Sequence, residues 1–494
     1  MNRIKLAVII STMKRKSSII IGLLLMLPFS LVLRANELPD LGDVSATVLS
    51  PLQERAIAEQ ILRQVAVSED VLRDAEVTDY LQTLGARLVE NGPDKRQKFN
   101  FFVVQDASIN AFAMPGGVIG VHTGLMLAAN SESELASVLG HEIGHVTQRH
   151  LARMLASQKY DTFKNLAGVA LALLVARSNP QLATGALTTA SAIGVQNQLD
   201  YTREHEREAD RIGLQILDSG GFDVRAMPQF FSTLQRSSRF YEGTAPSFLR
   251  THPLTTERIA DVANRVQTMH YKQVPDSIEF QLVRAKLRAL QGGAQSAIDL
   301  FEQGIRERRY MSEAAEHYGL AVALLRKGAY AQVAQELAWL KQNAPPHAMI
   351  ENLNVRLAVQ QNNPQQAALQ YQAALKVYPA SRALIYGYAE HFLAMRQANE
   401  AEALLKSKLD LYADDAYLYD LLAKAYAIQN KNLLSHQAQG ESYYRKYDLA
   451  RAIEQMDLAS KAGDGDFYQK SIVEARLKEL RRMMGETKKA KFWE

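Results

Sequence analysis

The chain has 494 residues, of which 47% are hydrophobic and 22% are charged. This length exceeds what one hydrophobic core usually supports, so more than one domain is expected, and the composition excludes a disordered or wholly membrane-embedded protein. Cysteine is absent, which excludes both a disulfide framework and a thiolate metal site.

The start of the chain has the layout of an export signal. Basic residues precede an apolar run from Ile19 to Leu33, and a small residue follows at Ala35. The run is short for a bilayer span, and Pro28 interrupts it. We therefore expect residues 1–35 to be a cleaved signal peptide.

Removal of this segment changes the apparent charge of the protein. Of the 57 basic residues, six lie in residues 1–35, which leaves 51 basic against 53 acidic residues. The high isoelectric point is therefore a property of the signal, and no nucleic acid is expected as a partner. Translation can start at Met1 or at Met13, because Met13 also begins a compact signal sequence.

The first half of the mature chain mixes helices with strands. Helical periodicity occupies residues 56–65 and 77–92, and two aromatic or β-branched segments at 99–106 and 116–126 indicate strands around a turn at Met114 to Gly117. Ser131 followed by Glu134 predicts a capping box at the start of a helix that continues to about Leu155.

Two further apolar segments follow, at residues 166–176 and 182–194. Neither is long enough to span a bilayer. They predict a helical pair that covers the domain or, alternatively, a mobile lid or a flap that touches a membrane. A helix from about Leu199 to Gly220 comes next.

The remainder of the chain predicts an all-α solenoid. Beyond residue 277 alanine-rich helices alternate with short turns, and a period of 34 residues relates turn positions and small residues. The turn positions are Gly328, Asn362, Arg396 and Asn430, and the small residues include Ala321, Val355, Ala389 and Ala423. This period is typical of the tetratricopeptide repeat. A further repeat near Gly293 is out of register by two residues, and an irregular helical bundle is the alternative.

The segment LGHEIGHVTQRH carries the first candidate site. His141 and His145 stand about 40° apart around a helix, so that both imidazoles can reach one zinc ion, and Glu142 lies beside them. A catalytic zinc site needs a third protein ligand. His150 would point about 140° away from His145 on a continuous helix, so we expect a surface or core histidine there.

The helix that contains HEREAD offers the better candidate for the third ligand. Glu206 can complete the set, and Asp210 one turn later can accept a hydrogen bond from a ligand imidazole. Glu204, His205 and Glu208 compete with Glu206, but only Glu206 has a carboxylate four residues on, followed by an apolar helix.

These motifs, together with NAFAMPGGVIGVHTGLM, resemble the M48 family of zinc metallopeptidases over roughly residues 60–270. The resemblance implies zinc ligands at His141, His145 and Glu206 with one zinc per chain, Glu142 as the general base, and Asp210 as a motif residue sometimes described as a proton donor. The predicted fold is an α+β zincin-like metalloprotease domain, mostly helical with a small sheet, at residues 36–272, followed by a tetratricopeptide-repeat domain at 278–485.

The family's exported, repeat-bearing members imply a role for this chain in the Gram-negative periplasm. It would be a zinc metalloendopeptidase with chaperone-like function that degrades misfolded or stalled outer-membrane β-barrel proteins. The implied partners are the β-barrel assembly machinery and the lipopolysaccharide-transport barrel. Residues 117–121 are the strand on which we expect an extended substrate to lie. The alternative is a non-proteolytic repeat adaptor with a structural or inactive zinc domain.

The segment LRTHPLTTERIADVANR carries a last candidate, His252. Pro253 holds this histidine in an extended conformation, and Thr255 or Thr256 can cap the following helix. Its place also resembles the M48 pattern. His252 is a packed structural residue, a donor to the oxyanion, or a plug on the fourth zinc position, and the sequence leaves all three roles open.

Overall fold

The computed structural model describes residues 49–95, 97–157, 202–240 and 247–492. The signal peptide predicted at residues 1–35 and the apolar segments predicted at 166–176 and 182–194 lie outside the described residues. Within the described part of the chain, no helix combines the length and the apolar character that a membrane span requires.

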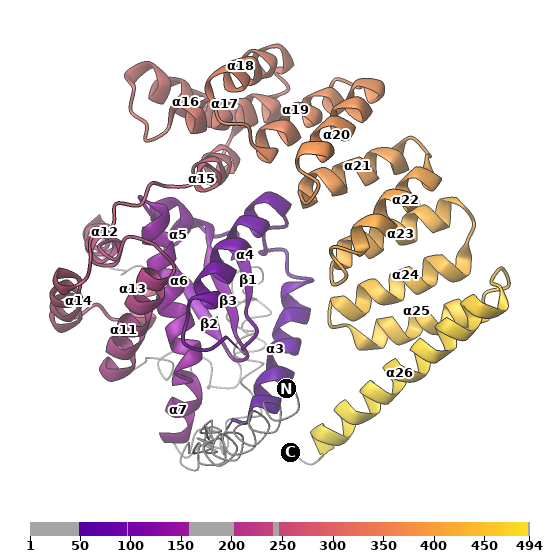
Figure 1. Cartoon of the computed structure of the whole chain (residues 1–494), viewed down its shortest axis with the longest axis horizontal. Helices are drawn as coiled ribbons and strands as arrows, with labels where there is room; N and C mark the ends of the chain where they lie inside the picture. Colours follow the sequence, from indigo (N-terminus) through magenta and orange to yellow (C-terminus); the bar gives the residue numbers. More distant parts are fainter. Residues whose placement is uncertain (1–48, 96, 158–201, 241–246, 493–494) are drawn as a thin grey trace, which may run out of the picture. The chain divides into compact units, whose positions relative to one another are not determined.

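The N-terminal part is mostly helical and contains a small three-stranded sheet (Figure 1), as the sequence predicts. Its elements are α3 (Pro51–Val65), α4 (Ala75–Glu90), β1 (Asn100–Val104), β2 (Ala111–Met114), β3 (Val118–His122), α5 (Thr123–Ala128), α6 (Glu132–Thr147), α7 (His150–Ser157), α11 (Arg203–Ser219), α12 (Ala226–Phe240), α13 (Ser247–Thr251) and α14 (Thr256–Thr268).

The sheet has the strand order β1-β3-β2, with β1 parallel and β2 antiparallel to β3. The expectation that residues 117–121 form an exposed substrate strand is therefore wrong, because β3 is hydrogen-bonded on both sides and is buried along its length. Strands β1 and β2 are the two edges of this sheet, and the sequence did not reveal β2.

The turn between β2 and β3 requires glycine. Gly116 and Gly117 have φ angles of 73° and 80°, in the left-handed region that disfavours side chains. A Cβ atom at Gly117 would lie 2.2 Å from the backbone oxygen of Lys98. The turn predicted at these residues is confirmed, and it presents β2 antiparallel to β3.

Helix α6 begins as predicted but ends earlier than expected. The Ser131 hydroxyl accepts from the Glu134 N–H at 3.1 Å, whereas the Glu134 carboxylate accepts from the N–H of Asn130, so only half of the predicted capping box forms. Arg149 has a φ of 51° and breaks the helix after Thr147. The single helix expected to continue to Leu155 is therefore two, because α7 starts in a new direction at His150.

The rest of the described chain is a succession of helix pairs (Figure 1). The helices are α15 (Ile278–Leu290), α16 (Ala294–Glu307), α17 (Glu313–Lys327), α18 (Tyr330–Asn343), α19 (Ala348–Gln360), α20 (Pro364–Val377), α21 (Arg382–Ala394), α22 (Ala398–Leu409), α23 (Ala416–Ile428), α24 (Asn432–Arg445), α25 (Leu449–Lys461) and α26 (Phe467–Phe492).

The 34-residue period is visible in the backbone. The turns inside four successive pairs each contain one residue with positive φ, and these are the predicted positions Gly328, Asn362, Arg396 and Asn430. The corresponding residue of the first pair is Gly292, two residues out of register as expected. Small residues at fixed places, such as Ala321 and Ala389, are buried where paired helices approach closely. The predicted all-α repeat architecture is therefore confirmed.

The hydrophobic core continues across the domain boundary predicted between residues 272 and 278. The Glu132 carboxylate at the start of α6 accepts from the Ser277 N–H at 3.1 Å and from its hydroxyl at 2.8 Å. The Phe280 ring of α15 packs 6.2 Å from the ring of Tyr80 in α4, and both belong to one core cluster that extends into α19. Helix α15 thus belongs to the N-terminal part as much as to the repeats.

A buried ion pair also joins the two parts. The Lys286 ammonium of α15 contacts the Glu76 carboxylate, lies 2.5 Å from Asp74 and is nearly inaccessible to solvent. Asn352 of α19 donates to the same Glu76 carboxylate at 2.8 Å. Burial opposes the charged form of Lys286, but the two carboxylates outweigh it and raise its pKa. Lys286 therefore keeps its positive charge inside the protein.

We expect Lys286→Ala to destabilise the protein by about 3–5 kcal/mol, because it leaves the buried Glu76 carboxylate without its counter-charge. The double variant Glu76→Gln/Lys286→Met should recover most of this loss. Urea unfolding measures both effects. Lys406→Ala, which removes an exposed pair with Glu402, is the matched control and should cost less than about 1 kcal/mol. A loss of similar size in both alanine variants would contradict the account.

Candidate metal centre

The site is formed where α6 and α11 pack against each other with small residues between them. A Cβ atom at Gly144 would lie 3.0 Å from the backbone oxygen of Ala209, and one at Gly140 would lie 3.2 Å from that of Gly213. Larger side chains would push the helices apart. The close approach lets the histidines of α6 meet the carboxylates of α11.

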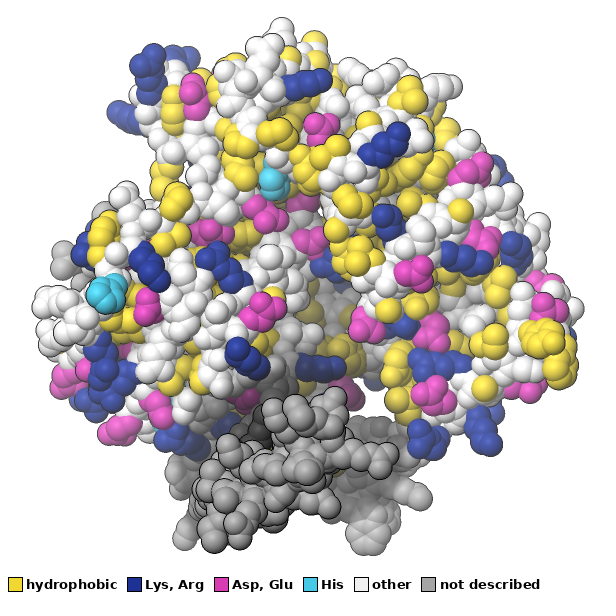
Figure 2. Space-filling view, viewed as in Figure 1, with side chains coloured by type: hydrophobic (Ala, Val, Ile, Leu, Met, Phe, Trp, Pro, Cys, Tyr) yellow, Lys and Arg dark blue, Asp and Glu magenta, His cyan; other side chains and the backbone are white. Residues whose placement is uncertain are grey.

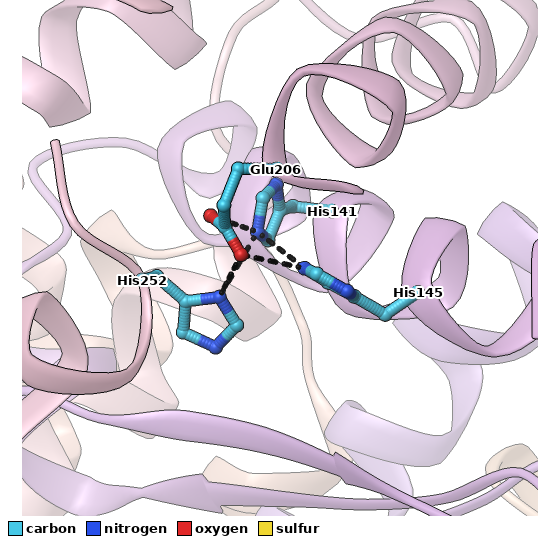
Figure 3. A group of neighbouring side chains, drawn as sticks. All are labelled: His141, His145, Glu206 and His252. Atoms are coloured by element: carbon cyan, nitrogen blue, oxygen red, sulfur yellow. Dashed lines mark hydrogen bonds and ion pairs between the residues drawn. The ribbon is translucent and has the colours of Figure 1, made fainter. Parts of the chain in front are cut away.

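Four buried side chains converge at this contact. Their ligand atoms all lie within 4.8 Å of one another, and Figure 3 shows three imidazoles directed at the carboxylate of Glu206. His141 Nε2 lies 3.0 Å from His145 Nε2, and these atoms lie 3.5 and 3.3 Å from the Glu206 oxygens. His252 Nδ1 lies 2.9 Å from Glu206 Oε1 and 3.4 Å from His141 Nε2.

These separations suit a zinc ion. Bonds of ~2.0–2.1 Å to a tetrahedral ion place neighbouring ligand atoms roughly 3.3 Å apart. The observed separations of 2.9 to 3.5 Å are close to that value. Imidazole and carboxylate are also the ligand types that zinc prefers when cysteine is absent. The residues present therefore fit the metal that the donor set implies.

Asp210 and Arg258 support the ligands from behind. Asp210 Oδ1 lies 2.9 Å from His141 Nδ1, the ring nitrogen opposite the cluster. The Arg258 guanidinium donates to both Asp210 oxygens at 2.7 and 2.8 Å, and it also lies 2.6 Å from Glu206 Oε2. One buried arginine thus fixes both carboxylates of α11. Thr255 caps the helix that carries it, as the sequence allowed.

The cluster keeps its carboxylates ionised although it excludes water. Burial alone would raise the pKa of Glu206, but the three imidazoles hold it well below its ordinary range. Burial opposes a charged His141, yet Asp210 and Glu206 raise the pKa of this imidazole to about 10. Burial lowers the pKa of His145 to about 3. The site thus demands positive charge beyond that of Arg258, and a metal ion can replace the proton on His141.

Glu142 lies beside the cluster and not within it. Its carboxylate accepts a hydrogen bond from the backbone N–H of Ala113 in β2, and His252 Nε2 lies 3.6 Å from Oε1. Burial raises the pKa of Glu142, which strengthens the carboxylate as a proton acceptor. It therefore lies between strand β2 and the histidine cluster.

The structure separates the competing residues of α11. Glu206 faces the histidines, whereas Glu204 is exposed. Glu208 Oε2 lies 3.1 Å from His150 Nε2 and 2.8 Å from Arg153. His150 is completely buried, and its Nδ1 lies 3.0 Å from Nδ1 of His145. A contact between these two histidines was not expected, because the sequence did not reveal the break at Arg149.

Arg258 was also missed in the sequence. It lies six residues after His252, in a helix whose other charged residues suggested an ordinary solvent-facing side. The sequence offered one signal, which is that Arg258 follows the His252-Pro253 pair by only a few residues. Nothing in the local pattern indicated that it has a buried partner. Only the folded chain brings α14 against α11.

Comparison with known proteins agrees with this geometry. Residues 75–266 match the model of peptidase family M48. The β-barrel assembly-enhancing protease of Escherichia coli K12 is 33% identical over 91% of this chain and 92% of its own length. A putative β-barrel assembly-enhancing protease of Vibrio cholerae is 38% identical over 58% of this chain and 60% of its length. The mitochondrial metalloendopeptidase OMA1 of Arabidopsis thaliana is 31% identical over 38% of this chain and 39% of its length.

The chain therefore belongs to peptidase family M48 and is a metallopeptidase. Among solved structures, a tetratricopeptide repeat protein of Parabacteroides merdae matches 56% of this chain and 99% of its own, with 15% identity and a TM-score of 0.26. The assignment of the repeats therefore depends on the 34-residue period observed in the backbone of this chain.

We expect the full chain to bind one zinc ion, and Glu206→Ala to abolish binding, because this change removes a carboxylate from the centre of the cluster. Metal analysis after dialysis measures the content. Glu204→Ala is the matched control, since it removes an exposed carboxylate of the same helix and should leave the content unchanged. Full occupancy in Glu206→Ala would place the third ligand elsewhere.

Proposed function

We propose that the chain is an exported zinc metalloendopeptidase that acts in the periplasm on misfolded or stalled outer-membrane β-barrel proteins, with a chaperone-like contribution to their assembly. The observation that carries this proposal is the convergence of His141, His145 and Glu206 beside Glu142. The relatives named β-barrel assembly-enhancing protease, which match over nine tenths of the chain, support the biological setting.

The roles follow from the positions of the side chains. His141, His145 and Glu206 hold the zinc, which when bound lowers the pKa of water and polarises a peptide carbonyl. Glu142 accepts the proton of the attacking water and then delivers it to the leaving nitrogen. Asp210 holds the His141 ring through Nδ1 and is itself paired with Arg258, so its role is positioning and not proton donation.

The edge strand β2 is the substrate platform that the arrangement favours. It replaces residues 117–121 in this role, since β3 has no free edge. An extended chain can pair with the outer backbone groups of β2, close to Ala113 and Glu142. Pairing of this kind requires unfolded backbone, which agrees with misfolded proteins as substrates.

We expect Glu142→Gln to lower peptide cleavage by about 10²–10⁴-fold while zinc content stays at the wild-type level, because the amide cannot accept the proton. Cleavage of a denatured outer-membrane β-barrel protein by the purified chain measures this rate. The same variant tests the adaptor alternative. If Glu142→Gln cells handled β-barrel assembly as well as wild-type cells, the repeat-adaptor function would be the dominant one.

His252 is proposed as a plug on the fourth zinc position. Its Nδ1 lies among the other ligand atoms at ligand-like distances, which supports this role over that of a donor waiting for an oxyanion. Stacking on Phe248, with ring centroids 4.7 Å apart, would hold the plug in place. A partner or client that displaces the loop would then expose the site.

We expect His252→Ala to raise basal peptide cleavage by about tenfold or more, since an open form populated at ~0.1–10% would become the main form. A fall of ~10²-fold would indicate an oxyanion donor, and an unchanged rate would leave only a packing role. The assay uses saturating zinc, with metal content measured in parallel. The control is His270→Ala, which removes an exposed histidine that follows helix α14.

The repeats are proposed to hold the partner. A cavity of about 900 Å³ lies between α3 and α4 on one side and α19, α21 and α23 on the other. Its lining combines tyrosines such as Tyr386 and Tyr417 with charges of both signs, a surface that suits an extended polypeptide. On the face shown in Figure 2, basic and acidic side chains are interspersed, in keeping with a protein partner.

We expect Val359→Glu, in this cavity, to weaken association with the β-barrel assembly machinery roughly tenfold, because it places a charge among the contact residues. Cleavage of a short peptide should not change. Leu458→Glu is the control, because Leu458 lies outside the cavity and is 41% exposed, against 42% for Val359. Equal association of the two variants would contradict a partner site in the cavity.

A further inference from the structure

A second buried histidine pair extends away from the proposed metal ligands. His145 directs Nε2 into the cluster and Nδ1 in the opposite direction, toward His150 Nδ1 at 3.0 Å. His150 Nε2 in turn lies 3.1 Å from Glu208 Oε2, and Arg153 donates to the same oxygen at 2.8 Å. The contacts form a line from the cluster to a carboxylate at the protein surface.

The chemistry of imidazole fixes the protons along this line. A neutral imidazole that binds metal through Nε2 carries its proton on Nδ1. The Nδ1–H of His145 can then donate only to an unprotonated Nδ1 of His150. His150 consequently carries its own proton on Nε2, and this N–H donates a hydrogen bond to the Glu208 carboxylate. Each group has one role, and no buried nitrogen in the line is left without a partner.

The backbone is bent to make this contact. On a continuous helix His150 would point about 140° away from His145. The left-handed conformation of Arg149, with φ of 51°, ends α6 and brings His150 back against it. Such a conformation costs roughly 1–3 kcal/mol in a residue other than glycine. The Arg149 guanidinium is held by Leu49 and Glu54, which stabilises the bend.

We infer that His150 is a positioning residue for zinc: anchored by Glu208, it accepts from His145 and fixes the tautomer and ring orientation with which His145 binds the metal. This inference rests on the proposed metal site. Residues in this position around zinc typically contribute 10- to 100-fold in affinity. Burial alone does not account for the arrangement, because an apolar side chain in this place would need no hydrogen-bond partner at Glu208 and would offer no acceptor to His145.

The test is the zinc affinity of the full chain, measured by competition with a chelator, together with the visible spectrum of the cobalt-substituted protein. His150→Phe keeps a ring of similar size but removes the acceptor, and we expect 10- to 100-fold weaker zinc binding. His150→Asn places its side-chain oxygen near the position of Nδ1, and it should restore most of the affinity and the wild-type cobalt spectrum even if the protein unfolds more readily.

Two controls separate this role from general stability and from the metal site itself. His317→Phe removes a buried histidine that contacts Glu336 and stacks on Trp339 in the repeats, and it should leave zinc affinity unchanged. Glu208→Ala should weaken zinc binding less than His150→Phe, since it removes only the anchor.

Wild-type affinity in His150→Phe, or equal losses in the phenylalanine and asparagine variants, would overturn the inference while His145→Ala still loses zinc. A wild-type chain that binds no zinc would overturn the proposed metal site, and the inference with it.

Discussion

The close packing of α6 against α11 is the constraint on which the site depends. Gly140 and Gly144 face Gly213 and Ala209, and the helices approach until an added methyl group would touch backbone. The glycines of the HExxH segment are therefore part of the chemistry, because they set the distance from imidazole to carboxylate. Glycine inside a helix costs roughly 1 kcal/mol relative to alanine, and the contact offsets that cost with burial along both helices.

The same packing creates an electrostatic problem that the surrounding residues solve. Two carboxylates, Glu206 and Asp210, are buried beside His141 and His145, and Arg258 neutralises only part of their charge. A protonated His141 supplies the rest, and a bound divalent cation would replace that proton. Support comes from both sides: Asp210 holds one histidine, and His150 holds the other. The His252 loop covers the remaining direction, and the edge of β2 leads to Glu142.

Features that depend on local periodicity could be predicted from the sequence. The turn of one helix sets the four-residue spacing of His141 and His145 and that of Glu206 and Asp210. The length of one helix pair sets the 34-residue period. The positive φ angles at Asn362 and Arg396 lie at the predicted turns. The helical domain with its small sheet followed from the same patterns.

Features that depend on tertiary contacts could not be predicted from the sequence. Strand β2 has four residues, two of them alanine, and only its pairing with β3 defines it. The bend at Arg149 has no glycine or proline to announce it, so the position of His150 was hidden as well. The boundary near Pro275 looked like a linker, but Ser277 and Phe280 are bound to the catalytic part. Nothing in the sequence indicated that Arg258 and Lys286 are buried. Only the structure shows that they pair with the buried carboxylates of Asp210 and Glu76.

We propose that the α6–α11 contact holds a zinc ion, and every role assigned to the site depends on that ion. Anomalous diffraction from crystals of the full chain, recorded on both sides of the zinc absorption edge, tests this proposal directly. We expect one peak per chain, ~2.0–2.2 Å from His141 Nε2, His145 Nε2 and a Glu206 oxygen. The absence of that peak in zinc-supplemented crystals, or a peak bound by a different set of side chains, would contradict it.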